Sequence, residues 1–93
     1  MIVGILELEL YLSGSDSLKY KRMILRSLRD RLRKKLNVSV AETALQEKWQ
    51  RARLGIAVVS NRRAHADEVL QKAFALVDSV NEAEIIDHGF EYK

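Results

Sequence analysis

The chain contains no cysteine and no proline, and aromatic residues make up only 6% of its 93 residues. The absence of cysteine excludes disulfides, thiolate nucleophiles and thiolate metal sites, which is compatible with a reducing cytoplasm. No proline interrupts a helix or strand by removing a backbone donor. Glu7 and Glu9 divide the first apolar segment, and no basic leader precedes it, so we expect neither a signal peptide nor a transmembrane helix.

The remaining composition is that of an ordinary folded domain, but its positive charge is concentrated in one segment. Apolar residues account for 47% of the chain and charged residues for 31%, with a formal net charge of +3. Residues 17–36 contain nine Lys and Arg residues against Asp30 alone, whereas the segments on both sides carry a net negative charge. A segment this basic indicates an anionic partner such as nucleic acid, a lipid surface or an acidic protein.

Five of these cations recur at steps of three, four, three and four and define a basic face: Lys19, Arg22, Arg26, Arg29 and Arg33. This spacing places them on one side of an α-helix. An apolar set with helical spacing predicts an amphipathic helix over residues 17–36, capped by Ser15 or Ser17: Leu18, Leu25, Leu28, Leu32 and Leu36. Like-charged neighbours destabilise a helix by about 0.2–0.5 kcal/mol per pair, so the basic face is either a contact for an anion or a solvated surface.

The other patterns complete the order β-α-β-β-α-β. Residues 2–12 alternate with even-numbered leucines on one side, which predicts a strand with one buried face. Strand patterns also cover residues 38–44, 54–60 and 83–92, with a polar connection over 45–52. Asn61 is placed to cap a second helix with a core face of Ala66, Leu70, Ala73, Val77 and Val80. We therefore expect a single α+β domain, residues 1–93, with the ferredoxin-like fold: a four-stranded antiparallel sheet carrying both helices on one face.

This fold leaves the second face of the sheet uncovered, and we call it the open face. No aromatic residue of residues 53–59 is available there to stack on a base, which argues against an RNA-recognition motif. Two interpretations remain for the open face. It is either a solvated surface with ion pairs inside the sheet, or a homodimer interface in which Arg53 faces a glutamate of a second copy. The interface residues would be Glu7, Glu9, Tyr11, Arg53 and Ala57.

The polar connection contains the only tryptophan, Trp49, two residues before Arg51. Tryptophan together with arginine is typical of binding hot spots and of base-stacking sites. Trp49 and Arg51 are therefore candidate binding residues beside the basic face. We favour the other interpretation, in which Trp49 folds back and covers the open end of the core while Arg51 stays available.

No group of residues predicts catalysis or metal binding. His65 and His88 are the only imidazoles, and they fall in the first turn of a helix and on the last strand. The turn Ser13-Gly14-Ser15 precedes a helix N-terminus, where backbone amides can bind phosphate, but no Walker or GxGxxG motif surrounds it, so we interpret it as structural. We expect no enzyme activity, cofactor, metal or small-molecule substrate.

Several short segments together resemble the YlxP-like family of short bacterial proteins. They are Ser17-Leu18-Lys19, Lys21-Arg22, residues 37–42, residues 49–52, Leu54-Gly55 and residues 59–61. The resemblance implies a ferredoxin-like fold, in agreement with the patterns above. It implies no particular activity, because the family is known chiefly as a domain of unknown function. Genes of the family commonly lie beside transcription-elongation, translation-initiation and ribosome-maturation factors, which associates it with RNA or the ribosome.

The sequence as a whole favours a small cytoplasmic, non-enzymatic binding protein. It would contact structured RNA, or the ribosome, through the basic face, with Trp49 and Arg51 adjoining. The alternative is a protein-interaction or homo-oligomerisation module that uses the open face and has no nucleic-acid role.

Overall fold

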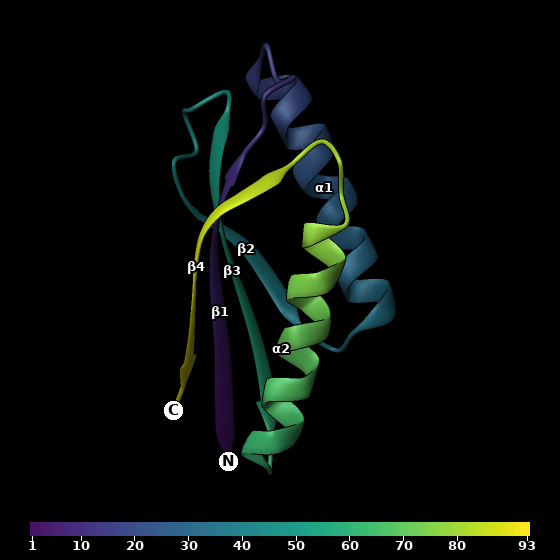
Figure 1. Cartoon of the computed structure of the whole chain (residues 1–93), viewed down its shortest axis with the longest axis vertical. Coiled ribbons are helices and arrows are strands. Elements are labelled where there is room, and N and C mark those ends of the chain that lie inside the picture. The colour runs from purple at the N-terminus through teal and green to yellow at the C-terminus, as the bar shows by residue number, and fades with distance from the viewer.

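Two helices cover one face of a four-stranded antiparallel sheet and leave the other face bare, as Figure 1 shows. The computed structural model describes all 93 residues. Its elements are β1 (Ile2–Tyr11), α1 (Leu18–Lys35), β2 (Ser39–Ala44), β3 (Arg51–Ser60), α2 (Arg63–Asp78) and β4 (Glu84–Tyr92). The strand order is β2-β3-β1-β4, so β2 and β4 form the edges. The predicted ferredoxin-like α+β fold is confirmed.

The core lies between the sheet and the two helices. Leu6, Leu8 and Leu10 of β1 are completely buried, which confirms that the even-numbered side of this strand faces the helices. The predicted core face of α2 is buried in full, and Leu25, Leu28 and Leu32 bury the docking side of α1. Leu18 and Leu36, at the two ends of the predicted apolar set, are half-buried. The hydrophobic periods of the sequence therefore predict which side of each element packs.

Two local predictions at helix and strand starts are wrong. Asn61 does not cap α2: Arg62 is the N-cap residue, without a side-chain hydrogen bond, and its backbone N–H donates instead to Ser60 Oγ at 3.1 Å. The polar connection is shorter than predicted, because β3 already begins at Arg51, which pairs with Tyr11 of β1. Pairing with the long strand β1 outweighs the polar character of Arg51 and Arg53. The cap of α1 is Ser17, whose Oγ accepts from the backbone N–H of Tyr20 at 3.1 Å.

Gly4 allows α2 to approach β1 closely. A Cβ atom on Gly4 would lie 3.0 Å from Leu70 Cδ1 and 3.3 Å from Ala66 Cβ, both on α2. We expect Gly4→Ala to lower the free energy of unfolding by about 1 kcal/mol, because the added methyl group overpacks this contact. Gly89→Ala is the matched control, since a Cβ there meets nothing within 4 Å. Denaturant melts of both variants test this, and equal stabilities would contradict the role assigned to Gly4.

Candidate nucleic-acid interface

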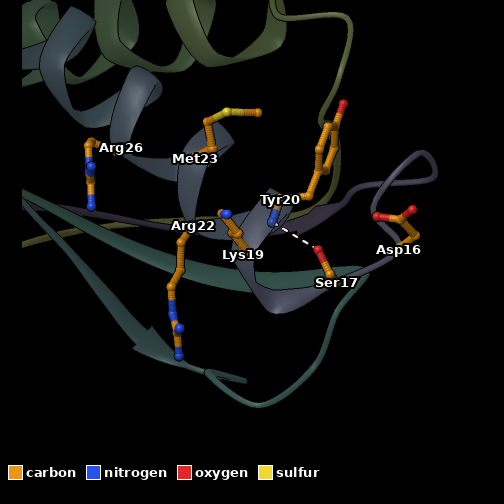
Figure 2. A pocket seen from close by; sticks show the side chains of 7 residues that line it. All are labelled: Asp16, Ser17, Lys19, Tyr20, Arg22, Met23 and Arg26. Carbon is orange, nitrogen blue, oxygen red and sulfur yellow. Dashed lines mark hydrogen bonds between the residues drawn. The ribbon is translucent and has the colours of Figure 1, made fainter.

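The basic face predicted for α1 lies on the outside of the protein. Because Leu25, Leu28 and Leu32 hold the adjacent side of the helix on the sheet, Lys19, Arg22, Arg26 and Arg33 are left exposed and Arg29, nearest to these leucines, is half-buried. Figure 2 shows Arg22 and Arg26 extending to the same side of α1, while Tyr20 points the other way. Lys19, Arg22 and Arg26 line a shallow hollow on the N-terminal half of the helix together with Met23 (Figure 2).

None of the five side chains of the basic face has an acidic partner. The ion pairs of the chain involve other cations: Lys21, Arg51, Arg53, Lys72 and Lys93. The first turn of α1 contains no acidic residue either, so its macrodipole is not balanced at the N-terminus. The cations of this face therefore form no ion pair within the protein, and Asp16 is the carboxylate that lines the hollow with Lys19, Arg22 and Arg26.

Arg29 carries an additional unsatisfied group in the middle of this face. Its Nε is buried and has no hydrogen-bond acceptor. A buried donor without an acceptor costs about 1–3 kcal/mol, and such groups in folded proteins ordinarily have a partner. This buried Nε is a cost to the fold and is not accessible to an anion at the surface.

Unlike the cations of the basic face, Lys21 of α1 is completely buried. Its Nζ donates to three carbonyl oxygens at the two ends of the β2–β3 connection: Leu45 at 2.9 Å and Gln46 at 3.2 Å after β2, and Arg51 at 3.2 Å at the start of β3. Glu42 Oε2 lies 3.0 Å from the same Nζ. Since an ammonium group has only three N–H donors, the contact with Glu42 is an ion pair without a hydrogen bond, and Oε2 has no donor of its own. Lys21 thus ties the β2–β3 connection to α1.

The sequence did contain a signal for this buried pair. Lys21 fills the gap in the leucine series of α1, at the helical spacing between Leu18 and Leu25. Glu42 occupies the same phase of β2 as the buried Val40. Opposite charges at core-facing positions of two consecutive elements predict a buried ion pair, because a lone buried charge is strongly unfavourable.

Trp49 lies in the connection that Lys21 anchors, and the prediction that it folds back over the core is wrong. Its side chain is 55% exposed. The end of the core is instead filled by Leu12 and by the aliphatic part of Lys21, both completely buried. Lys21, in the first turns of α1, therefore holds both ends of the connection that carries the exposed Trp49.

Arg51 and Arg53 belong to a different surface. Odd-numbered residues of β3 point to the open face, where Arg51 forms an ion pair with Glu9. Arg53 bridges Glu9 and Glu7, each at 3.1 Å. The structure therefore separates the Arg51 guanidinium from the basic face of α1, although its backbone carbonyl binds Lys21. It also contains the ion pairs within the sheet that formed one of the two interpretations of the open face.

The relationship to known proteins agrees with this architecture. A family model described as "Protein of unknown function (DUF503)" matches residues 3–89. The chain belongs to the DUF503 family. A protein of Bacillus subtilis (strain 168), described as "Uncharacterized protein YlxP", is 39% identical over 83 residues, covering 89% of this chain and 90% of that relative. The YlxP-like resemblance seen in the sequence is confirmed.

The remaining candidate residues of this DUF503 chain take part in local structure. His65 Nδ1 lies 3.2 Å from Ser60 Oγ, and the His88 ring packs edge-on against Phe74 with 4.8 Å between ring centroids. Ser15 is buried in the turn before α1 and its Oγ donates to the Ser17 carbonyl at 3.1 Å. Neither helix is long and apolar enough to cross a membrane.

At the far end of the sheet, Tyr92 of β4 donates a hydrogen bond to Asp67 of α2, and the Arg63 guanidinium lies 4.6 Å from the centre of its ring. Desolvation of the hydroxyl raises the pKa of Tyr92 above its usual value, as do the hydrogen bond to Asp67 and the charge of that carboxylate, while Arg63 opposes the shift. This contact joins α2 to β4 and lies outside the basic face.

Proposed function

We propose that this protein is a non-enzymatic, cytoplasmic RNA-binding protein that contacts the phosphates of a structured RNA through the basic face of α1. One observation carries the proposal: five cations share one side of an exposed helix and none of them has an acidic partner. Ribosomal RNA is the candidate target, in line with the association of YlxP-like genes with ribosome-maturation factors.

The energetics of α1 support a ligand for this face. Like charges at steps of three and four destabilise the helix, and Lys19 near its N-terminus opposes the macrodipole. Phosphates along a nucleic-acid backbone relieve both effects and release counterions on binding. Phosphate contacts position a protein without reading sequence, so we expect modest sequence preference and strong salt dependence.

A salt titration tests the proposal. Binding of a fluorescein-labelled stem-loop RNA, followed by anisotropy, is expected to weaken linearly in log K against log salt between about 50 and 200 mM. The magnitude of this slope is expected to be roughly 0.7–0.9 for each phosphate contact. The five cations of the basic face should therefore give a slope of roughly 3 to 5. Absence of binding at the lowest salt concentration would reject an RNA-binding role for α1.

The open face supports a second candidate function, homodimer formation, through one observation. Val3 pairs with Val59 and Ile5 with Ala57 across β1 and β3, and this apolar half of the open face leaves Val59 64% exposed. An exposed apolar patch of this kind fits a second copy related by a two-fold axis. The charged half, with Glu7, Glu9 and Arg53 already paired within the chain, would form the rim.

Replacing Ala57 with lysine tests the homodimer. We expect the variant to sediment as a folded monomer at concentrations where the wild type is a dimer, because the new charge is buried only in the assembly. Ala75→Lys adds the same charge on the exposed side of α2 and should leave the dimer intact. A wild-type protein that sediments as a monomer at every concentration removes this candidate.

A further inference from the structure

The β2–β3 connection that carries Trp49 is fixed at both ends. Lys21 donates hydrogen bonds to the carbonyls of Leu45, Gln46 and Arg51. Within the connection, the Lys48 N–H donates to the Leu45 carbonyl at 3.0 Å, which closes a turn. On its other side, the Gln50 carbonyl accepts from the Leu12 N–H at 2.8 Å. The backbone on both sides of Trp49 is therefore held by contacts to α1 and to the end of β1.

Leu45 shows that this conformation is imposed by its surroundings. Its φ of 63° lies in the left-handed region, the only such value among the non-glycine residues. For a leucine this conformation costs on the order of 1–2 kcal/mol. The shortest hydrogen bond of Lys21 goes to the carbonyl of this residue, so the buried ammonium compensates the strain and selects this shape of the connection.

The result is an exposed indole on a rigid support. Trp49 has a 55% exposed side chain and takes no part in the hydrophobic core. Its role is therefore not explained by packing. An aromatic ring on a preorganised backbone loses little entropy when a planar ligand stacks on it.

We infer that Trp49 is a stacking platform for an unpaired base of the RNA whose phosphates bind the basic face, and that Lys21 is the residue that positions it. This inference rests on the proposed function and narrows its ligand. A base within a duplex has both faces covered by its neighbours, whereas a loop, bulge or single strand offers a free face. The ligand class is therefore RNA with at least one unpaired nucleotide beside the bound backbone.

Lys21 contributes through the connection and not by touching RNA. It is completely buried, and its three N–H donors are used by main-chain carbonyls, so no donor remains for a phosphate. Arg22 and Lys19 flank it in sequence and are exposed, so the first turns of α1 offer two cations to a phosphate (Figure 2).

The single tryptophan of the chain makes the test direct, because all tryptophan fluorescence comes from Trp49. The probes are an oligouridine, an oligoadenosine and a blunt RNA duplex of equal length, each titrated at low salt. Stacking predicts quenching of the fluorescence by the single strands and not by the duplex. Trp49→Ala is expected to weaken single-strand binding roughly 5- to 150-fold and to leave duplex binding and the melting temperature unchanged.

Trp49→Phe and Ile86→Ala serve as controls. Phenylalanine keeps an aromatic ring and should retain most of the single-strand affinity, whereas Ile86, an exposed apolar residue of β4, should have no influence. Lys21→Met is measured at a temperature where circular dichroism shows it folded. It is expected to weaken single-strand binding in the wild-type background and to have no further effect in Trp49→Ala, a non-additivity that general destabilisation would not produce.

The outcomes separate this inference from the proposed function. Salt-dependent binding of both RNA forms, with no quenching and no loss in Trp49→Ala, overturns the stacking platform and leaves the α1 proposal standing. Equal losses from Lys21→Met with and without Trp49 overturn the positioning role. Absence of binding to any probe at low salt overturns the proposed function, and the inference falls with it.

Discussion

Replacing Arg22, Arg26, Arg29 and Arg33 with glutamine is expected to abolish most of the RNA affinity at low salt. The slope of log K against log salt should become flatter by about 3, because each lost phosphate contact removes roughly 0.7–0.9 from it. Folding should survive, since Arg22, Arg26 and Arg33 are exposed and only Arg29 is half-buried. Relief of the like-charge repulsion should leave the melting temperature unchanged or raise it.

The control for this experiment changes the same number of charges elsewhere. Arg31, Lys34 and Lys35 are exposed residues of α1 outside the basic face, and Arg62 lies at the start of α2. Their replacement by glutamine gives the same net charge but leaves the face intact. If both quadruple variants lose affinity equally, the binding depends on overall charge and not on this side of α1.

Lys21→Met is expected to lower the free energy of unfolding by about 2–4 kcal/mol, a large share of the stability of a domain of this size. The substitution preserves the aliphatic packing but removes one donor from each of three carbonyl oxygens and leaves Glu42 without its cation; of the three, the Leu45 carbonyl keeps the Lys48 N–H. Buried acceptors and charges that lose their partners account for a loss of this size. Urea denaturation followed by circular dichroism measures it.

Lys34→Met is the matched control, because Lys34 is an exposed lysine of the same helix and its loss should change stability by less than about 0.5 kcal/mol. The double variant Lys21→Met, Glu42→Gln should recover part of the loss, since the glutamine no longer leaves a charge without a partner. Equal stability of Lys21→Met and the wild type would show that the buried ammonium does not hold the connection.

Six of the nine cations of α1 thus fall into two contrasting environments. Lys21 is enclosed and pairs with main-chain carbonyls and Glu42, whereas the five residues of the basic face are on the surface without acidic partners. The buried position of Lys21 stabilises the fold, whereas the exposed basic face keeps its positive charge available to a ligand. A substitution at Lys21 should therefore act mainly on stability and on the β2–β3 connection, and one at Arg26 mainly on binding.

The sequence by itself determined the order of the elements, the docked side of each helix and the orientation of β1. These features follow from local periods: even-numbered leucines at a spacing of two put one face of β1 in the core, and leucines at spacings of three and four do the same for α1. The basic face follows from the same helical spacing of three and four residues. Each conclusion needs only the geometry of one helix or strand.

Only the tertiary structure decided the hydrogen-bond partners of Lys21, the exposure of Trp49 and the surface to which Arg51 belongs. The partners of Lys21 are carbonyls 24 to 30 residues away in sequence, and the exposure of Trp49 depends on the shape that those hydrogen bonds impose. Arg51 was assigned to the wrong surface because β3 extends further than its polar residues suggest, which turns its side chain to the open face and to Glu9. Periodicity does not encode such contacts, since each joins groups that are brought together only when the sheet has formed.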